Sequence, residues 1–559
     1  MKKETAARLV GILLLLAVFT GCTAKQSMTS PGLAIVSPHY VHQRLVPDTP
    51  FPGVNGAAIG ADGNLYVTHT GNGTITKIDL TTMTPSIHIP AYKGIFIPDD
   101  IAADSKGNLY VTGTTPLVGE VYRIAPEGGI TRIAQGMDAP NGIEYNERTG
   151  RLFVSECFQG NRVYEVDPTG QKPARLLIDK DIIPVPEGFD FDPDTGDLII
   201  PDMGTGKILR VNPDTGAITT IAQEFVTPIA LDIGPDKMIY VPELATGAVY
   251  KVTLDGAKRD KIAQLEPGLD NLAITPKGRL FVTSYWNATV YEVATDGSGK
   301  VTQLFPNGIN QPLGIVQKGQ ELYMADAIMI RSVTDGAYQQ TKLNAWASHG
   351  MPLPLSLADG PGDQLFWTDC IHGAIALGDP IKGQFNPVAG DLNLPMAVLM
   401  SPTEPLIYVA EYGAGQISTV SLKDGAKAVL TEGLEGPLAL AMIEGTLYVA
   451  ESKIGRISAI DPQNGAKKVC IAAMAAKPGA LAHDGNGNLL VLDGAGQKLI
   501  SVNPQTQNIT TLAAHLPIQY ATIGSYPPVE FPLPMFVNHA GDIYLGTNDR
   551  GVVKLKWVK

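Results

Sequence analysis

One short motif recurs along this chain at a nearly fixed interval. At residues 62–79, DGNLYVTHTGNGTITKID, turn residues alternate with two runs of period two, which predicts a β-hairpin. Equivalent third residues of the twelve copies lie 40–46 residues apart, except for a last gap of 54. A period of this length built from four short strands is typical of a β-propeller blade. The further copies lie at 107–114, 150–157, 196–203, 237–244, 278–285, 320–327, 363–370, 405–412, 445–452, 487–494 and 541–548.

The number of blades and the two ends of the array predict how the rings close. Propellers usually have about four to eight blades, so one ring of twelve is disfavoured and two tandem six-bladed propellers are expected. The twelfth unit lacks a fourth strand, and an orphan strand candidate at 42–46 precedes the first unit. We expect this strand to complete blade six and residues 301–305 to complete blade twelve. The expected all-β domains are then 39–299 and 300–559.

Composition agrees with many short strands and limits the partners. The chain has 60 glycines and 42 prolines but only 17% charged residues, a turn-rich composition. Its formal charge of −13, without a Lys/Arg cluster, argues against nucleic acid as a partner. After Cys22 the only cysteines are Cys157, Cys370 and Cys470, without a CxxC motif, so buried thiols are expected.

The N-terminus is read as a targeting segment. Basic residues precede an apolar run that is too short to span a membrane comfortably, which predicts a signal peptide at 1–21. Thr20-Gly21-Cys22 resembles the lipobox of bacterial lipoproteins. That resemblance implies lipidation of Cys22, a lipidated linker at 22–38, and an outer-membrane lipoprotein of the bacterial cell envelope that faces the periplasm or the cell surface. The alternative is an ordinary secretory signal with a chance cysteine.

The first residue of each inner strand should lie at one mouth of the central channel. In the first half these positions are polar in five of six blades, and in the second half none is polar. Converging carboxylate and amide oxygens suit a hard divalent cation such as Ca²⁺, so a metal site is expected in the first ring. The two sets are Asn55, Asp99, Asn141, Glu187, Ile229 and Asp270, and then Leu313, Leu353, Met396, Leu438, Gly479 and Met535.

Two alternatives limit this interpretation. Residues at loop edges are commonly polar, so the first set can be a solvated rim. Acidic residues that end the second strand in both halves are expected to cap turns, because both halves share them. They are Glu156, Asp202, Glu243, Asp326, Asp369, Glu411, Glu451 and Asp493. The run DFDPDTGD at 190–197 is likewise expected to be a structural turn.

The repeats of this chain resemble those of two known families. The blades look like NHL-repeat propellers over residues 40–559. The first half also resembles the SMP-30/gluconolactonase family through IPDDIAADSKGNLYVTGT, APNGIEYNERTGRLFVSE and VPEGFDFDPDTGDLIIPD. This resemblance implies metal ligation by Asn141 and Glu187, proton transfer by Glu187, and a family asparagine at Asp99. Asp270 is the nearest candidate for the family's remaining glutamate ligand.

Two functions follow as expectations. The first is a lipid-anchored binding or scaffold protein that presents a propeller face to a protein partner or a small-molecule ligand, since fold alone does not fix function. The alternative is a metal-dependent lactone hydrolase in which the cation activates water and Glu187 moves the proton. In both, the membrane is contacted through the lipid anchor only.

Lipidation of Cys22 is testable by Cys22→Ser. The substitution removes the acceptor thiol, so the protein should move from the membrane fraction to the soluble fraction and lose labelling by fatty acid. Fractionation and labelling of Cys157→Ser, which keeps Cys22, provide the control. Unchanged membrane partition of Cys22→Ser contradicts the lipoprotein prediction.

Overall fold

The computed structural model describes residues 34–46, 49–114, 118–157, 160–310, 312–326, 328–334, 337–344, 351–471, 477–518, 522–523, 529–530, 532–547 and 551–558. Cys22 and the expected signal peptide lie outside these residues. Strands make up nearly all the regular structure, with one 3₁₀ turn, η1 (Ala91–Lys93), among the described residues. No helix within the described ranges is long and apolar enough to span a membrane. Among the described residues two compact units emerge, one of 49–310 and one that combines 34–46 with 312–558.

The first unit is a closed ring of six four-stranded antiparallel sheets. In each sheet the first strand lies innermost and contacts at least one neighbouring inner strand, and β23 contacts β3 to close the circle. The sheets are β3 (Val54–Ile59), β4 (Leu65–His69), β5 (Thr74–Asp79), β6 (Thr84–Ile89); β7 (Pro98–Ala103), β8 (Leu109–Thr114), β9 (Gly119–Ile124), β10 (Ile130–Met137); β11 (Pro140–Asn146), β12 (Arg151–Glu156), β13 (Val163–Val166), β14 (Arg175–Ile178); β15 (Asp190–Phe191), β16 (Leu198–Asp202), β17 (Lys207–Val211), β18 (Ile218–Ala222); β19 (Asp232–Ile233), β20 (Met238–Pro242), β21 (Ala248–Thr253), β22 (Arg259–Gln264); and β23 (Leu269–Ile274), β24 (Leu280–Ser284), β25 (Thr289–Val293), β26 (Val301–Gln303).

The second unit is also a closed ring of six blades, in which β49 contacts β27. A two-residue strand, β1 (Ala34–Ile35), extends the fifth blade, and β47 (Thr522–Ile523) pairs with β48 (Val529–Glu530). The blades are β27 (Pro312–Lys318), β28 (Glu321–Asp326), β29 (Met329–Thr334), β30 (Ala337–Asn344); β31 (Leu357–Asp359), β32 (Leu365–Asp369), β33 (Ala374–Asp379), β34 (Gln384–Ala389); β35 (Pro395–Met400), β36 (Leu406–Glu411), β37 (Gln416–Ser421), β38 (Lys427–Thr431); β39 (Pro437–Ile443), β40 (Thr446–Glu451), β41 (Arg456–Ile460), β42 (Lys467–Ile471); β43 (Pro478–His483), β44 (Leu489–Asp493), β45 (Lys498–Val502), β46 (Ile509–Ala514); and β49 (Met535–Val537), β50 (Ile543–Gly546), β51 (Val552–Trp557), β2 (Tyr40–Val46).

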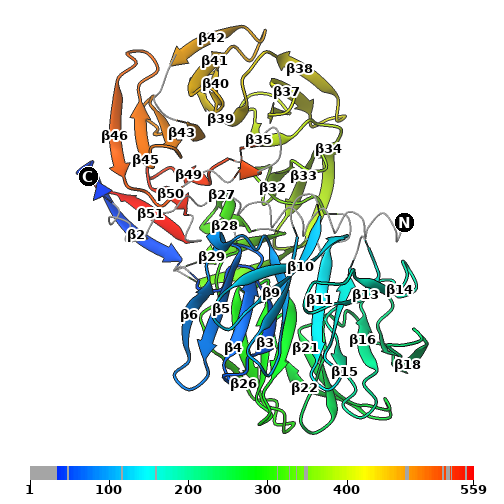
Figure 1. The fold of residues 1–559 in the computed structure, drawn as a ribbon. Helices are drawn as coiled ribbons and strands as arrows, with labels where there is room; N and C mark the ends of the chain where they lie inside the picture. The colour runs from blue at the N-terminus through cyan, green and yellow to red at the C-terminus, as the bar shows by residue number, and fades with distance from the viewer. Residues whose placement is uncertain are drawn as a thin grey trace. The chain divides into compact units, whose positions relative to one another are not determined.

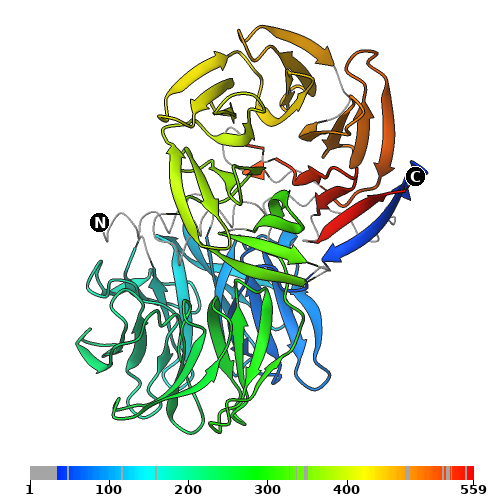
Figure 2. The ribbon, with the colours of Figure 1, turned by 180° about the vertical axis from the view of Figure 1, so that it is seen from behind.

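The expected all-β fold of twelve blades in two rings is confirmed, but the expected exchange of strands is wrong. Strand β2 pairs antiparallel with β51 and completes the twelfth blade, as the blue and red strands show in Figures 1 and 2. Strand β26 stays in the sixth blade beside β25. The N-terminal strand therefore closes the second ring, and the first ring is an insertion in the chain between this strand and the seventh blade.

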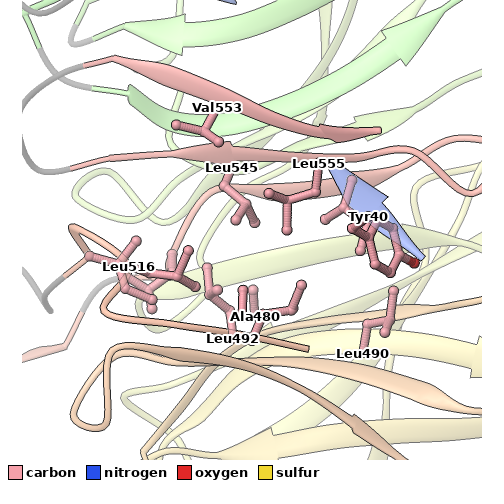
Figure 3. Close-up of a cluster of buried hydrophobic side chains, with 13 residues drawn as sticks. Tyr40, Ala480, Leu490, Leu492, Leu516, Leu545, Val553 and Leu555 are labelled. Carbon is pink, nitrogen blue, oxygen red and sulfur yellow. The ribbon is translucent and has the colours of Figure 1, made fainter. Parts of the chain in front are cut away.

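Side-chain packing explains why β2 belongs to the second ring. Tyr40 is 7% exposed and packs in a cluster with Leu545, Val553 and Leu555 of the twelfth blade and Leu490 of the eleventh (Figure 3). At the other end of β2, Val46 is fully buried. Burial of these apolar groups stabilises the exchanged strand by removing their surface from water.

The first ring closes without an exchanged strand, through hydroxyl groups on its second strands. Thr283 Oγ1, in the sixth blade, accepts from Asn271 N at 2.9 Å and donates to Asn55 O of the first blade at 2.6 Å. Thr112 Oγ1 makes the same relay from Asp100 N, at 2.9 Å, to Asn141 O, at 2.7 Å. Each hydroxyl thereby joins the inner strands of two successive blades.

The same linkage continues around part of the ring. Thr68 Oγ1 donates to Asp99 O, and Ser155 Oγ donates to Glu187 O. Pro201 and Pro242 occupy the equivalent sites in blades four and five, where a hydroxyl is absent. There Leu231 N donates directly to Gly188 O at 3.0 Å. Together these bonds satisfy backbone groups that the inner edge of each sheet leaves unpaired.

Thr283→Val should destabilise the first ring. Valine keeps the shape but leaves Asn271 N and Asn55 O without the buried hydroxyl, at a cost of about 1–3 kcal/mol. Calorimetric unfolding of the full chain measures the effect. Thr219→Val, at an exposed position in β18, is the control and should change stability little. Equal effects of the two substitutions would contradict a closing role for Thr283.

Candidate metal site at the mouth of the first channel

A β-bulge at the start of the inner strands β3, β7, β11 and β23 positions three of the four candidate ligands. The register slips between Pro98 and Ile101 in β7, and between Leu269 and Leu272 in β23. A bulge sets two residues against one on the partner strand and re-aims their side chains. Asp99 and Asp270 thereby leave the ladder, as does Asn141 at the equivalent slip in β11.

The structure gathers the four predicted site residues in one neighbourhood. Asn141 Nδ2 lies 3.4 Å from Asp99 Oδ1, to which it donates. Asp99 and Glu187 are buried, with 8% and 1% of their surface exposed. Glu187 Oε1 is buried and has no hydrogen-bond partner in the described part of the protein. Such an orphaned carboxylate oxygen is costly, so it indicates a missing proton or cation.

The charges of neighbouring carboxylates add to the effect of burial on the pKa values of the three mouth acids. Burial raises the pKa of Asp99 well above its usual value, and the charges of Asp270 and Asp100 raise it further. The pKa of Glu187 is also raised strongly, first by burial and then by Asp270 and Asp99. Burial and Asp100 raise the pKa of Asp270 to about 8. Burial disfavours the charged form, and no counter-charge offsets it among these causes.

The donor chemistry fits a hard cation, but the side chains do not yet surround one. Carboxylate and amide oxygens of Asp99, Asn141, Glu187 and Asp270 are the ligand types that Ca²⁺ prefers, and the orphaned Glu187 Oε1 supplies an unused acceptor. However, no group of three or more His, Cys, Asp or Glu side chains stands close enough to hold a metal ion in the described ranges. Binding would require side-chain rotation toward the cation.

The described mouth positions of the second ring carry no comparable chemistry. Leu313, Leu353, Met396 and Leu438 are buried there, each at most 7% exposed. The same bulge occurs in β27, β35 and β39. The polar set therefore belongs to the first ring and is not a requirement of the fold.

The acids that end the second strands act as structural caps, as expected. Glu243 Oε1 accepts from Val226 N at 2.6 Å, and Asp369 Oδ2 accepts from Leu353 N at 2.8 Å. Each bond holds the loop that enters the inner strand. The run at 190–197 also forms a turn, because Asp192 Oδ1 accepts from Asp194 N at 2.9 Å.

Cys157 belongs to the mouth region, although the sequence indicated only a buried apolar residue. It is 2% exposed, as are Cys370 and Cys470 at 5% and 7%. Burial raises the pKa of the Cys157 thiol well above its usual value, and the charges of Glu187, Asp99 and Asp270 raise it further. Cys157 is therefore a neutral thiol beside the carboxylates.

Further carboxylates line the channel and were missed. They lie one or three residues after the mouth position on the inner strands. These two positions are two residues apart, so their side chains point to the same side of the strand, toward the channel. A cavity of about 150 Å³ is lined by Asp100, Glu144, Asp190, Asp232 and Asn271. The sequence signal was available in Gly-Phe-Asp-Phe at 188–191 and in Asp232 at the equivalent position of the next blade.

Comparison with known proteins finds similarity mainly in the N-terminal part. A family model described as SMP-30/Gluconolactonase/LRE-like region matches residues 28–223. A gluconolactonase of Zymomonas mobilis subsp. mobilis is 28% identical over 189 residues, which cover 29% of this chain and 53% of that protein. The match thus spans about half the length of the curated relative.

Two solved structures are similar in part. The extracellular domain of a candidate one-component system from B. thetaiotaomicron aligns over 90% of this chain and 76% of its own, at 13% identity and a TM-score of 0.32. A candidate gluconolactonase aligns over 49% of this chain and 99% of its own, at 17% identity and a TM-score of 0.36.

The raised carboxyl pKa values predict a pH dependence. The folded state holds protons more tightly than the unfolded state, so stability should fall as pH rises through about 7 for Asp100 and about 8 for Asp270. In the presence of a chelator, the melting temperature of the first ring should drop between pH 5 and pH 9. Calorimetry of Asp270→Asn checks the cause, because this variant should gain stability at pH 9 but little at pH 5. A parallel profile for wild type and variant would contradict it.

Proposed function

We propose that this protein is an extracytoplasmic, lipid-anchored binding protein whose first ring holds one divalent cation at its channel mouth. The buried and unpartnered Glu187 Oε1 carries the proposal. Asp99, Asn141 and Asp270 complete the oxygen-donor set, and Ca²⁺ suits these ligands. A small ligand with carbonyl or hydroxyl oxygens would share the cation, and Cys22 would supply the membrane anchor.

The chemistry of the mouth supports binding over turnover. A cation bound there would polarise a ligand oxygen and lower the pKa of a bound water. The chain itself contributes oxygen ligands and negative charge, because the residues at the six mouth positions include no Lys, Arg or His. The second ring, which is closed by β2 and carries apolar residues at its described mouth positions, then serves as a scaffold or a face for a protein partner.

Lactone hydrolysis is the second candidate, and the similarity to a gluconolactonase favours it. In that case Glu187 would take a proton from water and return it to the leaving oxygen. Its pKa is raised, first by burial and then by the charges of Asp270 and Asp99, and perturbed pKa values are typical of proton-transfer groups. The two candidates share one site, so one variant tests both.

Glu187→Gln separates these outcomes. It removes the charge while nearly preserving shape, so the purified variant should bind Ca²⁺ at least tenfold more weakly than wild type. Chelation should lower the melting temperature of wild type, since a site at a hundredfold excess over Kd contributes about 2.7 kcal/mol. Metal analysis, Ca²⁺ titration calorimetry and a lactone hydrolysis assay provide the measurements.

Glu127→Gln is the control, because Glu127 is exposed in the turn after β9. It should retain wild-type metal binding. Hydrolysis that requires Glu187 and Ca²⁺ would establish the enzyme, whereas metal binding without hydrolysis would leave the binding role. If no metal co-purifies and a chelator leaves the melting curve unmoved, the mouth residues are a polar rim and both candidates fail.

A further inference from the structure

One side of the first ring's channel mouth is apolar. Blade five carries Ile229 at its mouth position, where the other five blades carry polar residues, and Ile229 is 8% exposed. The second strand of this blade is followed by Leu244, which is 3% exposed. Leu244 N donates to Thr227 O at 3.0 Å, so Leu244 lies beside the segment that leads to Ile229. The mouth therefore has a polar side and, at blade five, an apolar side.

The apolar character continues in the entry loops, by which we mean the loops that lead into the inner strands. Three residues before the mouth position, five of the six blades of the first ring carry an apolar residue. The six residues are Pro52, Phe96, Asp138, Pro184, Val226 and Pro267. At the described equivalent positions the second ring carries Asn310, Asn393, Glu435 and Pro532. The two rings thus have opposite patterns, because the second combines an apolar mouth with mostly polar entry-loop positions.

Three entry loops of the first ring expose large apolar side chains. Phe96 is 47% exposed, Ile182 57% and Val226 60%. Their chain neighbours are buried in the clusters between blades, namely Ile95, Ile183 and Phe225. The described parts of the entry loops of the second ring expose no large apolar side chain. Closure of a six-bladed ring therefore does not require these exposed groups.

Hydrogen bonds hold the loop of Val226 in place. Val226 N donates to Glu243 Oε1 at 2.6 Å. Arg259 Nη1 donates to Gln223 O at 2.9 Å and to Glu224 O at 3.2 Å. Because this backbone is already fixed, little conformational freedom is lost when a ligand contacts the exposed side chain.

The preceding entry loop, which leads to Glu187, is held in a similar way. Asn161 Nδ2 donates to Asp181 Oδ1 at 3.1 Å, next to the exposed Ile182. Ile182 and Val226 therefore lie on successive entry loops, on the face where the channel mouth opens. Both loops border blade five, where the mouth itself is apolar.

These observations deepen the proposed function and rest on it. A divalent cation at the mouth takes oxygen ligands, and the three acids of the site already supply negative charge, so an uncharged oxygen ligand suits it better than a further anion. Apolar side chains beside it would remove carbon atoms of the ligand from water. We propose that the mouth binds a small uncharged amphiphile, whose hydroxyl or carbonyl oxygens share the cation while its alkyl chain lies against Val226 and Ile182.

Two diols with the same head group test this proposal. 1,2-Octanediol and 1,2-propanediol present the same pair of hydroxyl oxygens and differ only in alkyl length. In NMR titrations of the full chain with Ca²⁺, octanediol should bind at least tenfold more tightly, because each methylene group that leaves water gains about fourfold in affinity. A chelator should abolish the binding of both diols.

Val226→Ser and Ile182→Ser remove apolar contacts without changing an oxygen ligand. Each should weaken octanediol binding about fivefold, and each should leave the affinities for propanediol and Ca²⁺ at their wild-type values. Ile87→Ser is the control, because Ile87 is 66% exposed on β6, an outer strand of the first ring. This control should bind both diols as wild type does.

Three results would overturn the proposal: octanediol binds no more tightly than propanediol, its binding survives chelation, or the double variant of Val226 and Ile182 binds it as wild type does. Failure of the proposed function gives a different result, which is the absence of Ca²⁺ binding by wild type. Sedimentation velocity tests the other occupant, a second copy of this chain. Self-association that Val226→Ser abolishes would make these loops an interface between copies and would also overturn the proposal.

Discussion

The first ring depends on hydrogen bonds that join one inner strand to the next. A propeller blade has an inner edge whose backbone groups face the channel, where neighbouring blades converge. Thr112 accepts from Asp100 N and donates to Asn141 O, and Thr283 repeats this relay between the last blade and the first. Because these short side chains connect the blades directly, the ring closes with its own strands only.

The same geometry that makes the relay creates the chemistry of the channel. A bulge frees two residues opposite each hydroxyl, and in the second blade these are Asp99 and Asp100. Asp99 faces the mouth, whereas Asp100 accepts a hydrogen bond from Ile143 N of the next blade. Burial of several acids in one narrow channel raises their pKa values, which couples the stability of this ring to protons and cations. The second ring, whose described mouth positions are apolar, has no such coupling of stability to protons and cations at those positions.

The sequence alone predicted the repeat, the number of rings and the mouth residues, because each depends on local pattern. The repeat carries its turns and alternation in every copy, and a fixed position in the repeat implies a fixed position in the blade. Pairing of the N-terminal strand could not be predicted in this way. The strands that contain His42 and Thr302 both alternate, and the choice between them rests on the burial of Tyr40 and Val46 against distant blades. Glu144 was missed because an acid within a strand resembles an exposed position until the channel around it is known.

In the chain, the first ring is inserted between β2 and the rest of the second ring, and this order has a consequence for folding during synthesis. During synthesis β2 is made early, yet its partner β51 is among the last segments of this chain to be made. The first ring needs no exchanged strand and can finish folding as soon as its sixth blade is complete. The second ring has a very large sequence separation between its closing partners, and loop-closure entropy slows contacts of that kind. Until β51 is made, β2 has no partner strand, so Tyr40 and Val46, which are buried in the finished ring, stay accessible to chaperones and proteases.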